Sequence, residues 1–80
     1  MTDYTPIECS EYSRYELAIL HRRRLRLSWR DTEGTVHVAV LQPLDLETRA
    51  GEEFLIARDP GGHRLRLRLD YIRRMEPLER

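Results

Sequence analysis

Two stretches in which apolar and polar residues alternate, mostly as leucine and arginine, constrain the fold of this chain more than any other feature. Residues 24–30 read RLRLSWR, and residues 64–69 read RLRLRL. Successive side chains of a β-strand point to opposite faces, so each stretch predicts a strand with one buried face and one basic face. With a valine row between them, they predict a buried set made up of Leu25, Leu27, Trp29, Val36, Val38, Leu65, Leu67 and Leu69.

The segment before the first alternation has a different period. Residues 1–9 contain Pro6 and are predicted to be extended. From about residue 10 to 21, apolar residues such as Tyr12, Tyr15 and Ile19 recur at helical spacing. Ser10 is the expected N-cap, and a capping-box spacing at Ser13 is an alternative start one turn later.

Turn residues divide the rest of the chain into short strands. Gly-, Pro- and Asp-containing turns are expected at 31–34, 50–51 and 59–62, and Gln42-Pro43 is expected to end the valine strand. Short strands are expected around 54–57 and 71–75. We therefore predict one domain over residues 1–80. It is mainly β (α+β), with a helix packed on a five-stranded antiparallel sheet that closes into a small barrel over about 23–76.

Charge balance and cysteine content say more about the cellular compartment of the protein than about its activity. Fourteen basic and fourteen acidic residues balance, and every basic residue is arginine. One cysteine, Cys9, cannot form an internal disulfide. No stretch of apolar residues is long enough to span a bilayer, and we expect a cytoplasmic protein without a membrane partner.

No catalytic constellation is evident, so we expect neither an enzyme nor a cofactor. Cys9 has no histidine near it in sequence, and the spacing of Cys9, His21, His37 and His63 does not fit a metal site. The adjacent acids at 52–53 are expected to point to opposite faces of a strand, which argues against a shared acid–base site. The glycines at 61–62 belong to a turn, because no phosphate-binding helix follows them.

The arginine rows allow two interpretations. If the two alternating strands pair, they would form one basic patch for RNA, composed of Arg24, Arg26, Arg64, Arg66 and Arg68. The alternative is an ordinary solvated face, which we favour because aromatic residues that could stack on bases are not interleaved with these arginines.

Three segments of the chain resemble the Rho-binding antiterminator family, known as Rof. The first segment is residues 4–12, YTPIECSEY, continued by YELA at 15–18. The second is TRAGEEFL at 48–55, and the third is LRLRLDYI at 65–72. This resemblance implies an Sm-like barrel and an inhibitor of Rho-dependent transcription termination, which binds Rho at its primary RNA-binding surface and blocks RNA loading.

The implied partner-binding surface is the acidic, aromatic helix. Its expected residues are Glu8, Glu11, Tyr12, Ser13, Arg14 and Glu16. An acidic helix would suit a surface built to attract phosphates. We expect a monomer with Rho as its partner. The alternative is a small Sm-like RNA-binding barrel that uses the arginine-rich face.

Overall fold

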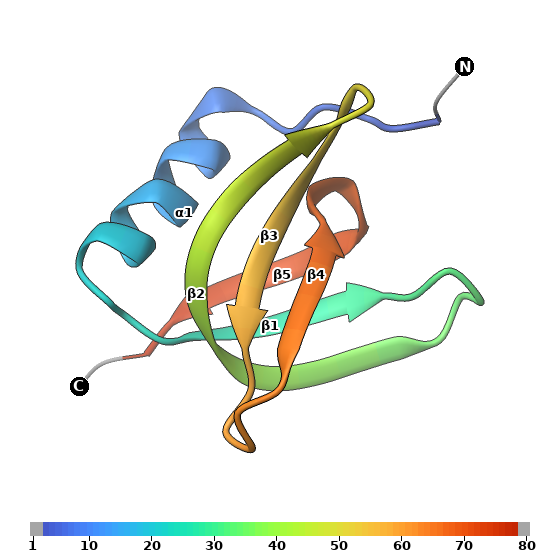
Figure 1. The fold of residues 1–80 in the computed structure, drawn as a ribbon. Helices are drawn as coiled ribbons and strands as arrows, with labels where there is room; N and C mark the ends of the chain where they lie inside the picture. The colour runs from blue at the N-terminus through green and yellow to red at the C-terminus, as the bar shows by residue number, and fades with distance from the viewer. Residues whose placement is uncertain (1–2, 79–80) are drawn as a thin grey trace.

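A computed structural model describes residues 3–78 and contains one α-helix followed by five strands. Helix α1 spans Cys9–Leu20, and the strands are β1 (Leu25–Arg30), β2 (Val36–Arg49), β3 (Glu52–Arg58), β4 (Arg64–Arg68) and β5 (Ile72–Pro77). A short 3-10 helix, η1 (Leu69–Tyr71), joins β4 to β5 (Figure 1). The strand order is β4-β3-β2-β1-β5 and every pairing is antiparallel. The predicted mainly β architecture is confirmed.

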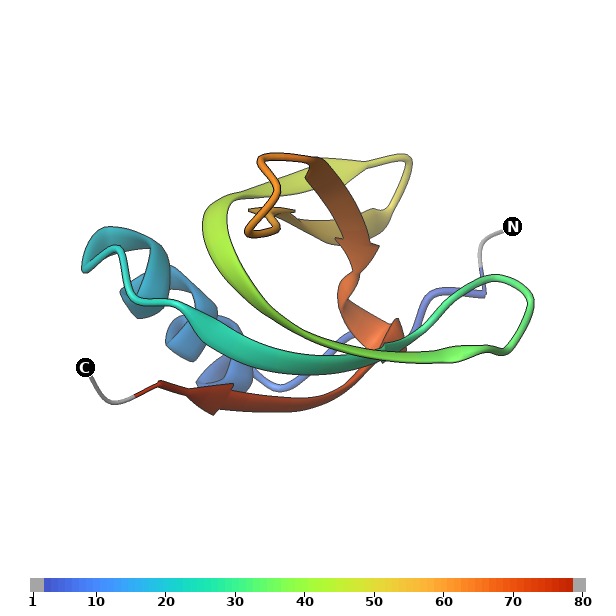
Figure 2. The same ribbon diagram turned by 90° about the horizontal axis from the view of Figure 1, so that it is seen from below.

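Strand β2 belongs to both halves of the sheet. Its first part, 36–41, pairs with β1, and its second part, 42–49, pairs with β3. The register shifts between Pro43 and Asp45, and the strand curves strongly (Figure 2). The expectation that Gln42-Pro43 ends the strand was wrong. Pro43 is tolerated because it lies beside an irregularity in the pairing, where a missing N–H donor costs least.

The hydrogen-bonded sheet of residues 3–78 is open. Strands β4 and β5 lie at its two edges and pair with β3 and β1, respectively. Pairing between these two edges would be needed to close a barrel, and the strand pairings of the described chain do not include it. The described strands therefore form a strongly bent antiparallel sheet, and the expected closure into an Sm-like barrel is not shown by their pairings.

Helix α1 begins and ends close to the predicted bounds, but its caps differ. Glu8, not Ser10, precedes the helix in an extended conformation, and no side chain caps the first turn. At the other end Arg22 adopts a positive φ of 54°. The N–H of Arg23 then donates to the carbonyl of Ala18, and that of Arg22 donates to Ile19. This αL ending satisfies helix carbonyls that would otherwise lack donors, and it turns the chain into β1.

The core is formed by residues of α1, of strands β1 to β4 and of η1. Its buried residues are Tyr15, Ala18, Leu25, Leu27, Leu41, Leu55, Ala57, Leu67 and Leu69. Four predicted core leucines are among them, whereas Trp29 and Leu65 are half-buried. No helix among residues 3–78 is long and apolar enough to cross a membrane.

The valine row was assigned to the wrong face. Val36 and Val38 are 49% and 65% exposed. They pair with Arg30 and Ser28 of β1. Directly opposed residues in an antiparallel pair share a face, so these valines lie on the outer, polar face of β1. The core-facing positions of this part of β2 are the residues opposite Leu25 and Leu27.

Candidate functional site

The most chemically distinctive surface of the molecule is a cleft between the β1–β2 hairpin and the β3–β4 pair. It measures about 340 Å³. The residues that line it are Trp29, Arg30, Asp31, Thr32, Glu52, Phe54, Arg66, Leu67, Arg68 and Tyr71. We call it the Trp29 cleft. It combines three aromatic rings with three guanidinium groups, contributed by opposite halves of the bent sheet.

Arg66 lies over an aromatic ring in this cleft. Its guanidinium carbon is 5.0 Å from the centre of the Phe54 ring, which is within the range of a cation–π interaction. Nη1 of Arg66 is also 3.3 Å from Oε1 of Glu47 on β2. The side chain remains 45% exposed, so its guanidinium group is held over Phe54 and stays accessible to a ligand.

Trp29 is held in place from the hairpin side. Its ring stacks on His37, with centroids 5.4 Å apart and planes inclined by 19°. Nε2 of His37 is 2.8 Å from Oδ2 of Asp31, while Oδ1 of Asp31 accepts the N–H groups of Glu33 and Thr35. The hydrogen bond from His37, followed by that from Thr35, lowers the pKa of Asp31. The turn at 31–34 thus fixes one wall of the cleft.

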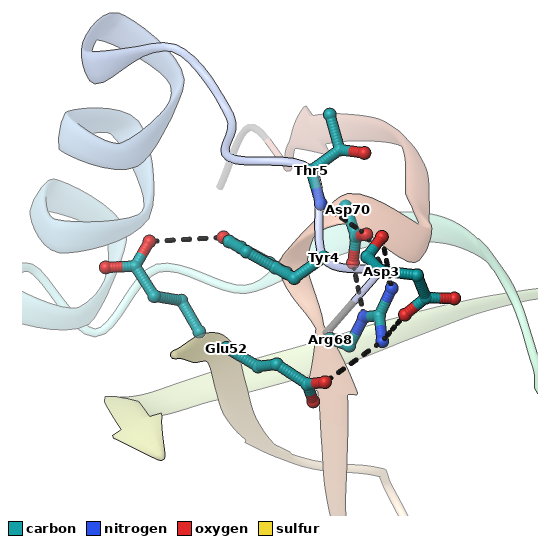
Figure 3. Close-up of polar contacts among 7 residues, drawn as sticks. Asp3, Tyr4, Thr5, Glu52, Arg68 and Asp70 are labelled. Carbon is teal, nitrogen blue, oxygen red and sulfur yellow. Dashed lines mark hydrogen bonds and ion pairs between the residues drawn. The ribbon is translucent and has the colours of Figure 1, made fainter. Parts of the chain in front are cut away.

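Arg68 forms the opposite wall and is fully engaged within the protein (Figure 3). Nε and Nη2 each bond to an oxygen of Asp70 at 2.7 Å, and Nη1 contacts Asp3 at 2.8 Å and Glu52 at 3.4 Å. The same guanidinium lies 4.2 Å from the centre of the Tyr71 ring. Only 11% of its side chain is exposed. We call this group, with Tyr4, the Arg68 cluster.

The Arg68 cluster also fastens the N-terminal segment to the sheet. The N–H of Thr5 donates to Oδ2 of Asp70 at 3.0 Å, and the Tyr4 hydroxyl donates to Oε1 of Glu53 at 3.1 Å. Burial, and then the bond to Glu53, raise the pKa of Tyr4 to about 12. Burial disfavours the charged form of Asp70, but hydrogen bonds from Arg68 and Thr5 outweigh it and hold the pKa of Asp70 below its ordinary value.

A second hollow of about 350 Å³ adjoins the Trp29 cleft and shares Arg30, Arg68 and Tyr71 with it. Arg73 also lines this hollow. Within residues 3–78, neither Arg30 nor Arg73 forms an ion pair with a carboxylate. Asp3 and Asp70 also line the second hollow, but both pair with Arg68, so in the described part of the chain Arg30 and Arg73 are cations without an acidic partner beside the Tyr71 ring.

The two alternating strands do not pair, which was the condition for a single arginine patch. Arg26 lies on β1, and Arg64, Arg66 and Arg68 lie on β4, but two strands separate β1 from β4. Arg24 precedes β1. Aromatic residues are not interleaved with these arginines in the sequence, but the fold brings Phe54 to Arg66, and Tyr4 and Tyr71 to Arg68.

The residues expected to form a helical partner-binding surface are mostly accessible. Glu8, Glu11, Ser13, Arg14 and Glu16 are exposed, as a surface role would require. Tyr12 is half-buried and packs against the core, so it is not a free aromatic anchor. Tyr15 lies three residues after Tyr12 on the same helix and is only 2% exposed, so it belongs to the core.

The groups considered for catalysis or metal binding do not converge in the described chain. Cys9 is exposed. His37 and His63 bond to Asp31 and Asp59 within two separate hairpin turns. No group of three or more histidine, cysteine or carboxylate side chains in residues 3–78 is placed to hold a metal ion.

The adjacent acids of β3 have different partners, as their alternation predicted. Glu52 contacts Arg68 (Figure 3), and Glu53 accepts the hydrogen bond of the Tyr4 hydroxyl. The turn at 59–62 is confirmed: Gly62 has a φ of 88° and donates to the carbonyl of Asp59. These groups serve structure, and the absence of an enzymatic activity stays a prediction.

Comparison with known proteins decides the family. Residues 12–77 match the WYL domain family. The chain belongs to the WYL domain family. The fold of this WYL domain is also similar to part of proteasome accessory factor B/C (PafBC) of Arthrobacter aurescens, with a TM-score of 0.80 and 20% identity. The alignment covers 99% of this chain and 13% of PafBC, and no curated protein matches the sequence.

Membership of the WYL family corrects the expected kinship with Rof and the role in Rho-dependent termination. The most specific part of that resemblance, YTPIEC at 4–9, lies before the region that matches the WYL family. The later similarities, at 48–55 and 65–72, fall inside the WYL match, where they are hairpin and strand patterns of this WYL domain.

Sequence reasoning missed the Trp29 cleft, although one pattern could have indicated it. The turn at 59–62 fixes the β3–β4 register, which pairs Ile56 with Arg66 and Phe54 with Arg68. Extending that register from the turn would have placed the arginine row beside Phe54. The approach of Trp29 and Tyr71 could not be found in this way, because it depends on the bend of β2 and on η1.

Proposed function

We propose that this WYL domain is a non-catalytic regulatory module that binds an anionic ligand with a flat ring system in the Trp29 cleft. The observation that carries the proposal is the stacked pair of Arg66 and Phe54, which opens onto the same hollow as Trp29 and Tyr71. Aromatic faces and guanidinium planes bind planar rings by stacking, while arginine also binds phosphate or carboxylate through paired N–H donors.

The distribution of charge supports an anionic ligand. Arg68 is neutralised by carboxylates of its own cluster, so it supports the wall and is not a ligand-binding group. Arg30 and Arg73 have no such partners within residues 3–78 and are exposed. A ring in the Trp29 cleft would therefore extend its anionic group toward Arg30 and the adjoining hollow. Nucleotides combine a flat ring and phosphate in this way.

The size of the cleft favours binding over chemistry. A hollow of about 340 Å³ is at the small end of ligand sites and lies in an open surface. Its carboxylates already have partners: Asp31 bonds to His37, and Glu52 contacts Arg68. A regulatory role is also in keeping with the similarity to part of PafBC, a protein named as an accessory factor.

Intrinsic fluorescence tests this proposal directly, because Trp29 is the single tryptophan of the chain. We expect AMP, or a short single-stranded oligothymidine, to quench Trp29 emission, whereas inorganic phosphate alone has little effect. Arg66→Gln and Arg30→Gln should each weaken binding by roughly tenfold, as expected for the loss of one stacked or charge-assisted contact.

Arg58→Gln is the matched control, since Arg58 is exposed on β3 and does not line the cleft. Emission that stays constant up to millimolar concentrations of both ligands would contradict the proposal. Equal binding by Arg66→Gln and the parent would also contradict it.

A further inference from the structure

A separate apolar groove lies between α1 and β5 and shares no lining residue with the Trp29 cleft. Its volume is about 270 Å³. Ala18, Leu25 and Met75 form part of its lining, although Ala18 and Leu25 are only 5% and 1% exposed. The groove therefore reaches down to the hydrophobic core. We call it the α1–β5 groove.

Apolar surface continues from the groove onto the outer side of α1. Leu17 lines the groove and is 54% exposed, and Leu20, one turn further along the helix, is 73% exposed. Residues three apart on a helix are neighbours on its surface. Leu17 and Leu20 thus extend the apolar floor into an accessible strip, and such a strip marks an interaction site more often than an isolated leucine does.

The ionisable side chains that line the groove are all basic. Arg14, His21 and Arg23 line it, and no acidic residue does. Within residues 3–78, Arg14 and Arg23 form no ion pair. Both guanidinium groups are therefore available to an external carboxylate, and charge complementarity selects an acidic partner.

We propose that the α1–β5 groove binds a short acidic peptide segment of a partner protein. One or two apolar side chains of the segment lie on Leu17, Ala18 and Leu25, and flanking carboxylates face Arg14 and Arg23. The volume fits side chains of this kind and is small for a whole cofactor. No Phe, Tyr or Trp side chain lines the groove, so it lacks the broad stacking surface that single-stranded nucleic acid uses.

Titration of the 15N-labelled protein with a blocked synthetic peptide, Ac-EDLLDE-NH2, tests the groove. We expect chemical-shift changes centred on Ala18, His21, Leu25 and Met75. The peptide Ac-EDSSDE-NH2 removes the apolar side chains, and Ac-KKLLKK-NH2 reverses the charge. Both control peptides should bind much more weakly. Shifts that are absent at millimolar peptide, or equal for the lysine peptide, would overturn the proposal.

Variants of exposed residues separate this site from general electrostatics. Arg14→Glu combined with Arg23→Glu should weaken binding of the acidic peptide by roughly tenfold or more, because two favourable charge contacts become repulsive. Leu17→Ser should also weaken it. Arg58→Glu makes the same charge reversal at one site outside the groove and should leave binding nearly unchanged. Equal loss in Arg58→Glu, or full displacement of the peptide by oligothymidine, would overturn the proposal. Failure of nucleotide binding at the Trp29 cleft would not contradict the proposal for the α1–β5 groove, because the two sites share no lining residue.

Discussion

Replacing Arg68 with methionine should remove a large part of the stability of this domain. The bond from Arg68 to Asp70 is bidentate, with two N–O distances of 2.7 Å, and the two side chains are 11% and 9% exposed. Loss of one member of such a pair leaves a nearly buried carboxylate, which costs about 3–5 kcal/mol. The contact with Asp3, which is 80% exposed, adds little.

Urea unfolding of the parent and of Arg68→Met, followed by circular dichroism, measures this cost. Arg68→Lys keeps the charge but loses the planar fork, so its loss should be intermediate, at about 1–2 kcal/mol. The double variant Arg68→Met with Asp70→Leu should recover much of the stability, because it also removes the unpaired carboxylate. A loss below about 1 kcal/mol for Arg68→Met at pH 7 would refute this reasoning.

The effect should depend on pH with a defined sign. The pKa of Asp70 is lowered in the folded protein, so its ionisation stabilises the fold above the unfolded-state pKa of about 3.9. That contribution decreases as the pH falls through the folded-state value. In Arg68→Met, burial without the guanidinium favours the neutral carboxyl instead. The difference in unfolding free energy between parent and variant should therefore narrow below about pH 4.

Further predictions concern stability. Ala50 has a φ of 53° in the two-residue turn between β2 and β3, so Ala50→Asn should stabilise the fold by about 1 kcal/mol in thermal unfolding; a lower melting temperature would contradict the turn assignment. Leu41→Ala should cost about 2–5 kcal/mol in urea unfolding, because Leu41 is fully buried. Val38→Ala should change the unfolding free energy by less than about 0.5 kcal/mol, since Val38 lies on the exposed face; a similar loss in both variants would contradict the β1–β2 register.

The sequence predicted the helix and the strands well wherever the spacing of apolar residues changed clearly or a turn had characteristic residues. The change from helical to alternating spacing near Leu25 separated α1 from the sheet, and the turns at 31–34 and 59–62 were found from their residue types. The valine row failed because alternation gives two faces but does not say which one is buried. That choice depends on the β1–β2 register, in which Val38 faces Ser28.

The candidate site was harder to predict because its parts are distant in sequence. Trp29, Phe54 and Tyr71 belong to three separate elements, and only the bend of β2 brings them to one hollow. The sequence pattern identified the arginines, but it did not show which of them are accessible and which are enclosed by carboxylates. Arg66 is accessible and stacked, whereas Arg68 is enclosed by carboxylates from residues as far away as Asp3. Sequence spacing alone does not distinguish these two environments.

The sharing of β2 between both halves of the sheet has a consequence for how the chain acquires its structure. Strands β2, β3 and β4 are joined by short turns, so their pairing requires little loop closure. Strand β5 must instead return to β1, where Pro77 pairs with Leu25, a residue far from it in sequence. Since one strand carries both sets of hydrogen bonds, neither half can detach without exposing part of the other. We therefore expect amide protons in the regularly paired stretches of β2, on either side of the Pro43–Asp45 irregularity, to exchange only through global unfolding, in one cooperative transition.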